Sequence, residues 1–250
     1  MKKLLLTGVA LTALLSGSAI AADLRVAPAY RAVPLASFSW TGCYVGGHVG
    51  YGRSNYSQQI QFDDTNVFPE QTFTDNLSPK GVVGGVQGGC NYQAGYIVYG
   101  IEGDYSWANR TDSRAYAFPG AGDNDSVAFS AKTQSLWSVR GRVGVAHDRA
   151  LVYLTAGWGG ANFNYNYALI DADAGGSAAS LSFNTDGVVF GGGLDYALTN
   201  NIIVGAEYLH YAFGDDKRLL PVAVIGPNPQ DYINLKSVDV VRVRASYKFW

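Results

Sequence analysis

This sequence of 250 residues has few of the residues that most often build reactive sites. Only 15% of its residues are charged, the net charge is −2, and it contains three histidines, two cysteines and one methionine. No basic run or patch stands out, so the sequence does not favour nucleic acid as a partner. Two thiols are too few ligands for zinc, so we expect no metal.

Long apolar runs are also missing beyond the first 21 residues, which excludes membrane helices because such a helix needs about 20 apolar residues. The chain starts with two lysines, an apolar stretch over 4–15 and an A-x-A cleavage site at 19–21. This order is typical of a secretory signal peptide, here 1–21, whose apolar part is too short for a membrane anchor. We therefore expect export, with 22–39 as a periplasmic lead-in and 40–250 as the folded part.

The residues that the chain does have in abundance indicate β-structure. It contains 31 glycines, 17 tyrosines and 5 tryptophans. Aromatic residues favour strands, while this much glycine weakens helices. Alternation of apolar and polar residues then marks eight candidate strands. They lie near 42–52, 81–92, 95–107, 133–147, 150–162, 184–197, 201–212 and 237–249.

The connections between these strands alternate in length. Four are each longer than twenty residues, at 53–80, 108–132, 163–183 and 213–236, and three are tight, at 93–94, 148–149 and 198–200. Loops longer than about 12–15 residues are uncommon in compact soluble domains. The sequence therefore predicts an all-β fold, an eight-stranded antiparallel transmembrane up-and-down β-barrel with four long external loops and three short periplasmic turns. A soluble lipocalin-like barrel is disfavoured, because its apolar face would point inward.

The polar face of several strands carries charges that should reach the lumen. In the last strand, Val241 and Val243 alternate with Arg242 and Arg244. The expected lumen charges are Glu102, Asp104, Arg140, Arg142, Glu207, Arg242 and Arg244. Side chains fill the interior of an eight-stranded barrel, and charges buried there must be paired. We interpret these residues as a structural salt-bridge network; the functional alternative is an ion-conducting path. For the strand over 150–162 the sequence does not decide which face points to lipid, because both of its faces are apolar.

Cys43 and Cys90 fall in the lipid-facing phase of adjacent strands, both near the periplasmic end. Pairing them also pairs Val45 with Gly88, so the two strands share a plausible register. Two cysteines in an oxidising compartment favour a disulfide. The alternative is two thiols that miss each other because the shear of the barrel shifts the register.

Aromatic rings are expected to form girdles at the two membrane interfaces. The periplasmic girdle would hold Trp40, Tyr92, Tyr196 and Tyr247, and the outer one Tyr51, Trp107, Tyr208 and Tyr211. The loop aromatics Phe62, Phe68, Phe73, Tyr116 and Phe118 are candidates for stacking on a ligand. His48 faces the lumen in mid-strand, where we expect a hydrogen-bonded core residue; the alternative is a haem ligand or a catalytic base.

The segment 40–51 (WTGCYVGGHVGY) resembles the opening strand of the alphaproteobacterial outer-membrane barrels of the Omp25/Omp31 group, described as porin-like or outer-membrane immunogenic proteins. The segments 89–93, 191–208 and 243–249 resemble the first periplasmic turn, the sixth and seventh strands and the last strand of that family. The resemblance implies an abundant surface barrel, and some relatives are described as haem-binding or as envelope-integrity proteins. The chain departs from the family at its two cysteines and at Trp250, which follows the usual terminal Phe.

These observations lead to one expected function and one alternative. We expect a non-enzymatic, structural, surface-exposed protein of the cell outer membrane, with a side-chain-filled lumen and at most small solute flux. The alternative is a haem-binding or adhesion module that acts through the external loops, with haem as its cofactor or a host surface as its partner. Expected partners are outer-membrane lipid, lipopolysaccharide and the barrel-insertion machinery. Tyr247, Phe249 and Trp250 form the expected assembly signal, and a monomer is favoured.

Overall fold

The computed structural model describes residues 38–62, 71–75, 78–117, 126–170, 177–214, 218–219 and 232–249. The chain divides into two units, Met1–Ala36 and Ser37–Trp250, and every described residue belongs to the second. The expected signal peptide over 1–21 and most of the expected lead-in lie outside the described residues. No helix in the described part of the chain has the length and hydropathy needed to span a bilayer.

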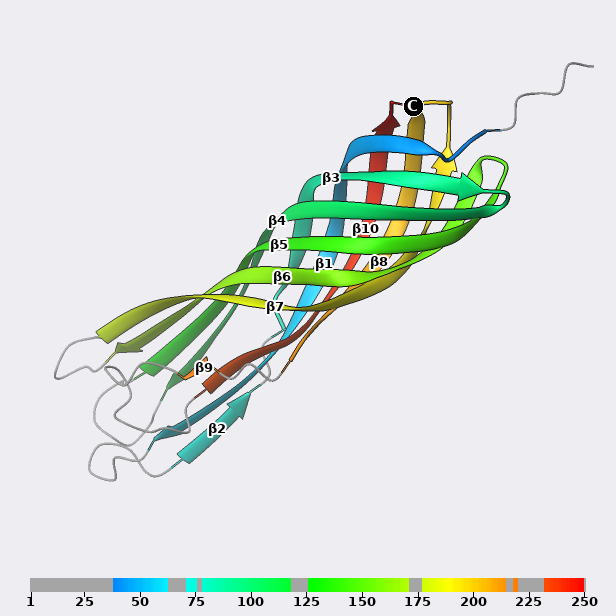
Figure 1. Cartoon of the computed structure of the whole chain (residues 1–250). Helices are drawn as coiled ribbons and strands as arrows, with labels where there is room; N and C mark the ends of the chain where they lie inside the picture. Colours follow the sequence, from blue (N-terminus) through cyan, green and yellow to red (C-terminus); the bar gives the residue numbers. More distant parts are fainter. Residues whose placement is uncertain are drawn as a thin grey trace, which may run out of the picture. The chain divides into compact units, whose positions relative to one another are not determined.

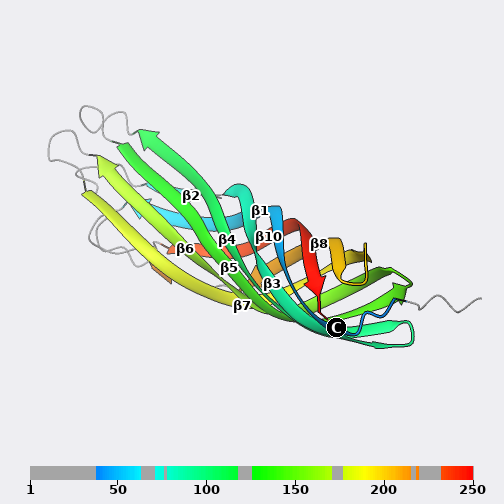
Figure 2. The same ribbon diagram turned by 90° about the horizontal axis from the view of Figure 1, so that it is seen from above.

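Eight long strands form a closed antiparallel barrel in the second unit (Figures 1 and 2). They are β1 (Gly42–Phe62), β3 (Lys80–Ala94), β4 (Ile97–Ala117), β5 (Ser126–His147), β6 (Ala150–Ile170), β7 (Ser177–Ala197), β8 (Ile202–Phe213) and β10 (Tyr232–Lys248), with short strands β2 (Gln71–Asp75) and β9 (Arg218–Leu219) at the edges of β1 and β10. Neighbours in the chain pair in turn, and β1 pairs with β10 from Tyr44↔Lys248 to Gln59↔Tyr232, which closes the sheet. The predicted fold class and the pairing of first and last strands are confirmed.

Tight turns join β3 to β4 and β5 to β6. Gly95 occupies the first of these turns with φ +65°, and Asp148 occupies the second with φ 51°. Two-residue hairpin turns require positive φ, which glycine adopts without strain. The prediction placed the first turn at 93–94, two residues too early, because the strand continues as far as Ala94 before it meets the glycine.

Six strands, β1, β4, β5, β6, β7 and β10, run further than predicted, and the expected loops 53–80, 108–132, 163–183 and 213–236 are shorter in consequence; β3 and β8 stay close to their predicted bounds. The cause is an inversion of polarity along the strands that continue. In the membrane part of β6, Val152 and Leu154 face outward and are 59% and 70% exposed. Further along the same strand, Asn162 and Asn164 face outward, and Phe163 between them is buried and faces inward. Beyond this point the apolar residues lie on the inward face. The pattern expected of a lipid-facing strand, with apolar residues outward, therefore ends although the strand continues.

Buried apolar side chains fill the barrel beyond the point of inversion. They form one cluster that includes Leu136, Phe163, Val189, Leu209 and Val238. Such an arrangement, apolar inside and polar outside, is that of a soluble barrel. The barrel therefore has a lipid-facing part and a water-facing extension built from the same strands. The undecided phase of strand 150–162 is also resolved, since Leu151 and Tyr153 point inward and Val152 and Leu154 outward.

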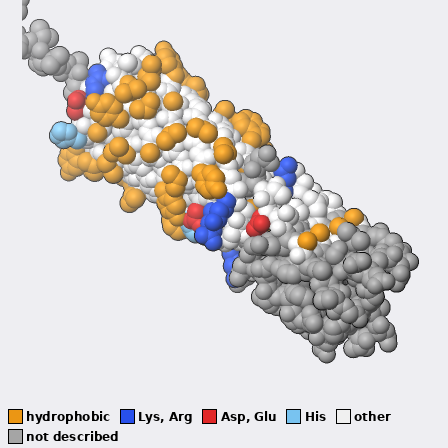
Figure 3. Space-filling model, turned by 180° about the vertical axis from the view of Figure 1, so that it is seen from behind, with side chains coloured by type: hydrophobic (Ala, Val, Ile, Leu, Met, Phe, Trp, Pro, Cys, Tyr) orange, Lys and Arg blue, Asp and Glu red, His pale blue; other side chains and the backbone are white. Residues whose placement is uncertain are grey.

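A band of exposed apolar side chains surrounds the lipid-facing part. It includes Val49, Ile101, Val143, Leu154 and Val243, all on the outward face of their strands. Figure 3 shows hydrophobic side chains spread over one end of the visible face, and most of its visible Lys, Arg, Asp and Glu side chains toward the middle. Two residues predicted for the aromatic girdles are elsewhere: Trp40 and Tyr211 are only 0% and 1% exposed and lie inside the barrel. Tyr211 has the inward phase of Leu209, and Trp40 precedes the first strand.

Candidate functional site

A layer of charged side chains crosses the lumen in the lipid-facing part of the barrel. The strand register brings its members together, because Glu102 on β4 lies opposite Arg140 on β5, and Arg242 on β10 lies opposite Glu207 on β8. All seven residues predicted for the lumen are buried. They are Glu102, Asp104, Arg140, Arg142, Glu207, Arg242 and Arg244.

Arg140 connects three carboxylates. Its Nη2 lies 2.8 Å from Glu102 Oε1 and 2.8 Å from Asp104 Oδ1, and its Nη1 lies 3.0 Å from Glu207 Oε1. Its Nε donates to Ser138 Oγ at 2.9 Å. Charge-assisted bonds of this kind are stronger than neutral ones. Arg140 therefore ties β5 to β4 on one side and to β8 across the lumen.

Glu102 is the centre of the layer, since it forms ion pairs with all four arginines. Its Oε1 lies 2.8 Å from Arg140 and 3.7 Å from Arg242, while its Oε2 lies 3.3 Å from Arg142 and also contacts Arg244. The hydroxyl of Tyr44 donates to the same Oε2. One carboxylate thus neutralises guanidiniums from β5 and β10 at once, which makes it the group whose loss leaves most charge unpaired.

The sequence analysis missed one carboxylate of this layer, Asp195 on β7. Its Oδ2 lies 2.7 Å from Arg142 Nη2 and its Oδ1 lies 3.6 Å from Arg244 Nε, and the residue is buried. With it, four carboxylates face four guanidiniums, so the charges of the layer balance. The signal was present in the sequence, because the apolar side chains of Leu194 and Tyr196 suit the lipid-facing side, and Asp195 between them must then point inward.

His48 belongs to the same layer, and the described structure surrounds it with hydrogen-bonding groups. Its Nδ1 lies 3.0 Å from Gln87 Oε1, and its Nε2 lies 2.8 Å from Ser106 Oγ and 3.4 Å from Arg242 Nη1. An arginine can only donate, so Nε2 accepts and Nδ1 carries the proton that it donates to Gln87. This assigned tautomer makes His48 a neutral bridge between β1, β3 and β10.

Glycines make room for the larger side chains of the layer. A Cβ on Gly89 would lie 2.7 Å from the hydroxyl oxygen of Tyr44, and one on Gly193 would lie 2.6 Å from that of Tyr153. Tyr153 in turn packs beneath Arg142, whose guanidinium carbon lies 3.8 Å from the ring centroid. Gly89 and Gly193 therefore leave the space through which the Tyr44 and Tyr153 side chains cross the lumen.

An apolar plug closes the periplasmic mouth below the charged layer. Trp40 donates from its backbone N to Gln93 Oε1 at 2.7 Å and from its indole to Asp148 O at 3.2 Å. Phe38 packs edge-on against it at 5.0 Å between ring centroids, and Lys248 Nζ lies 4.5 Å from the Phe38 ring. The charged layer thus lies between this plug and the apolar cluster of the extension.

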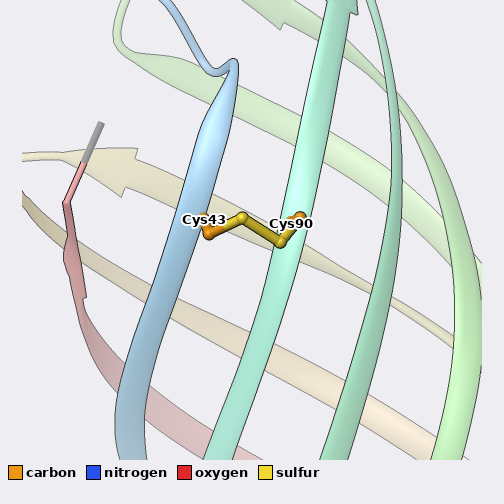
Figure 4. Close-up of a disulfide and its surroundings, with 2 residues drawn as sticks. All are labelled: Cys43 and Cys90. Carbon is orange, nitrogen blue, oxygen red and sulfur yellow. A yellow bond between two sulfur atoms is a disulfide. The ribbon is translucent and has the colours of Figure 1, made fainter.

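The two cysteines are joined on the outward face near the periplasmic end. Cys43 on β1 and Cys90 on β3 are direct cross-strand partners, and their sulfurs are 2.07 Å apart (Figure 4). The same register pairs Val45 with Gly88, as the sequence suggested. Tyr247 and Phe249 of the expected assembly signal lie nearby and are exposed, and the backbone N of Phe249 donates to Cys43 O at 3.0 Å.

Several predicted features lie outside what the structure describes. These are Trp250, Phe68 and Phe118, together with the side chains of Phe62, Phe73 and Tyr116. Among the described residues, no three His, Cys, Asp or Glu side chains are arranged so that they could hold a metal ion.

Comparison with known proteins identifies a family model and relatives that match this chain. The family model described as outer membrane protein beta-barrel domain matches residues 8–249. The 31 kDa outer-membrane immunogenic protein of Brucella melitensis is 31% identical over 259 residues, which cover 100% of both chains. The chain belongs to this family of outer-membrane β-barrel proteins.

A second relative agrees with this assignment. The 25 kDa outer-membrane immunogenic protein of Brucella abortus is 28% identical over 232 residues, covering 92% of this chain and 85% of the relative. The solved structure of the outer membrane protein OprG from Pseudomonas aeruginosa matches 84% of this chain and 96% of its own, with 13% identity and a TM-score of 0.44. Membership of the family places the barrel in the outer membrane of a Gram-negative bacterium, and the resemblance noted in the sequence is confirmed.

Proposed function

We propose that this protein is a non-enzymatic structural element of the outer membrane whose lumen is closed to all but the smallest solutes. One observation carries the proposal: four guanidiniums and four carboxylates are buried and paired across the lumen. Eight strands enclose an interior that side chains can fill. Apolar clusters above and below this layer add two further barriers.

The energetics favour a structural role for the layer over a conducting path. A conducting path needs mobile water and ions beside its charges, whereas each arginine here has carboxylates within ion-pair distance. Breaking a buried pair by removing one partner leaves an uncompensated charge and costs about 3–5 kcal/mol. The layer therefore couples the stability of strands β4, β5, β7, β8 and β10 to one another.

Conductance of the purified, folded protein in planar lipid bilayers tests the proposal. We expect no large, stable channel from the intact protein, and none from the Glu102→Ala variant, which should instead unfold at a lower denaturant concentration. Lys236→Ala, which removes an exposed charge on β10, is the control and should leave both readouts unchanged. A stable single-channel conductance of porin size from the intact protein would overturn the proposal.

A further inference from the structure

The strands of the water-facing extension fall into two groups. β3 begins at Lys80 and β8 ends at Phe213, while their neighbours continue. Beyond these ends, β4, β5, β6 and β7 stay paired with one another, and β1 and β10 pair with each other and with β2 and β9. No ladder among the described residues joins the two groups there. The group of β4 to β7 is therefore bordered by β4 on one side and by β7 on the other (Figure 2).

The border formed by β4 has the features that keep a sheet edge from pairing with other chains. Its sequence includes Arg110, Asp112 and Arg114, and its ladder with β5 has a register shift just before Arg110. In addition, the backbone N of Ser78 donates to Asp112 Oδ2 at 3.2 Å. Charged residues and bulges are common protections of exposed edges. We therefore expect the β4 border to resist a further strand.

The border formed by β7, over 177–186, lacks these protections. This stretch contains no lysine, arginine or proline, and its ladder with β6 reaches Leu169↔Ser177 without a register shift. Its ladder with β8 starts only at Gly187↔Phe213, so no described strand pairs with 177–186 on that side. Alternate residues of a strand direct their N–H and C=O groups to the same side. The β7 border thus presents a row of backbone donors and acceptors that suits another strand.

The apolar core of the extension is also less covered at the β7 border. On β6, Phe163 and Tyr165 are only 3% and 0% exposed. Their direct partners on β7, Phe183 and Leu181, are half-buried although they pack against the same apolar cluster. The side chains of one further strand beside β7 would cover what remains exposed of Phe183 and Leu181. Backbone and side chains at this border therefore favour the same kind of occupant.

A second copy of this chain in the same membrane does not fit the β7 border. Every copy has the same orientation, so β7 runs toward the periplasm in each, and two β7 borders cannot pair in the antiparallel sense. Strands of such barrels tilt by about 35–45°, so a two-fold axis along the membrane normal would cross two β7 strands at about 70–90°. β4 of a neighbouring copy runs in the opposite direction, but its charged border opposes pairing. The fitting strand therefore comes from a different molecule.

We propose that the β7 border binds an extended segment of an extracellular polypeptide, which adds a strand to the sheet of β4 to β7. The segment runs antiparallel to β7 and so continues the line of β8, because antiparallel pairs are the more stable ones. Its apolar side chains, at every second position, contact Leu181 and Phe183 on the inward face. Small or hydroxyl-bearing side chains between them lie beside Ser182 and Asn184 on the outward face. This binding goes beyond the structural role and does not depend on the closed lumen.

A synthetic peptide added to the folded full chain in detergent tests this binding. The probe has alternating valine and threonine residues, blocked ends and a terminal lysine on each side for solubility. The control peptide has proline in place of one central valine and one central threonine, so both of its edges lose a backbone donor. We expect fluorescence anisotropy to show that the probe binds at least tenfold more tightly than the control. Hydrogen–deuterium exchange should slow over 177–186 of β7 and stay unchanged over 113–117 of β4.

Cross-linking then separates the β7 border from other outward positions. Ser182 and Asn164 are direct partners on β7 and β6, and both face outward. Ser182→Cys and Asn164→Cys each add one thiol to a chain whose own cysteines are bonded to each other. A disulfide needs Cα atoms within about 7 Å, which an adjacent strand at about 4.8 Å satisfies and a second strand at about 9.6 Å does not. With probes that carry a cysteine in place of each threonine in turn, we expect at least tenfold more product from Ser182→Cys.

The possible results decide the proposal in either direction. A heat-dependent shift in gel mobility verifies that both variants are folded. Equal binding of the probe and the proline peptide, or no binding of the probe at millimolar concentration, would overturn the proposal. Slowed exchange on β4 instead of β7, or equal cross-linking of the two variants, would overturn it as well. None of these results bears on conductance, which tests the proposed function separately.

Discussion

Individual charged residues inside this barrel act as members of a balanced set. Glu102 pairs with all four arginines of the layer, and Asp195 pairs with Arg142 and Arg244. Because the layer holds equal numbers of positive and negative groups, the loss of any one carboxylate leaves a guanidinium buried without full compensation. The loss of unfolding free energy on removing a carboxylate then depends on the environment of that carboxylate and not on its place in the sequence.

Asp195 and Asp186 form a matched pair on β7 that tests this dependence. Asp195 points into the lumen, while Asp186 is exposed on the outer face and accepts from the Trp158 indole at 2.9 Å. We expect Asp195→Asn to lower the free energy of unfolding by about 3–5 kcal/mol and Asp186→Asn to change it by less than about 0.5 kcal/mol. Urea-induced unfolding in lipid vesicles measures both. Equal effects from the two variants would contradict the assignment of Asp195 to the layer.

Asp239, which lies just beyond the apolar band, makes the stability of the fold depend on pH. Burial alone would raise the pKa of Asp239, but hydrogen bonds from Tyr208 and His210 and the nearby charge of Arg53 outweigh it and lower the pKa. A carboxyl group with a lowered folded pKa stabilises the fold above its unfolded pKa, and this contribution is lost as pH falls through the folded value. We therefore expect the intact protein to lose stability below about pH 4 more steeply than Asp239→Asn. Parallel acid unfolding curves for the two would contradict this.

The strands that continue into the water-facing extension combine two environments whose polarities are opposite. In β6 the outward side chains change from Val152 and Leu154 to Asn162 and Asn164, and the inward ones become apolar. A search for strands with apolar residues on the lipid-facing side finds only the part of β6 that lies in the membrane. That is why the sequence predicted eight strands and their order but made six of them too short.

Leu154 and Asn164, on the same face of β6, provide a test of this inversion. A lysine at the lipid-facing position costs about 2–4 kcal/mol near the bilayer centre and about 0–1 kcal/mol near its surface. We expect Leu154→Lys to show the larger value and Asn164→Lys the smaller one or none. Equilibrium unfolding in vesicles measures the difference. A similar loss in both variants would mean that the bilayer also covers the extension.

The pairing of β1 with β3 is fixed by a covalent bond as well as by hydrogen bonds. We expect the double variant Cys43→Ser with Cys90→Ser to be about 2–4 kcal/mol less stable than the oxidised protein, because the bond limits the freedom of the unfolded chain. Unfolding with and without reductant measures this, and reductant should not affect the double variant. Two free thiols in the unfolded, unreduced protein would refute the bond.

For the molecule as a whole, the sequence predicted the barrel, its location and seven of the eight layer charges. Asp195 was recoverable from its neighbours, but the positions of Trp40 and Tyr211 were not. An aromatic residue near a strand end suits a girdle as well as a plug, and only the three-dimensional closure of the barrel decides between them. Trp40 lies inside because, just before β1 begins, it packs into the buried cluster that closes the periplasmic mouth.

The water-facing extension has a consequence for how the protein can vary between strains. Above the bilayer, inward residues such as Phe163 hold the core, while alternate residues such as Asn164, Ser182 and Asn184 face outward. Within the extension, this second set of side chains is the one accessible from outside the barrel. Substitutions can therefore accumulate at these alternate positions of β6 and β7, while the barrel stays as stable as before.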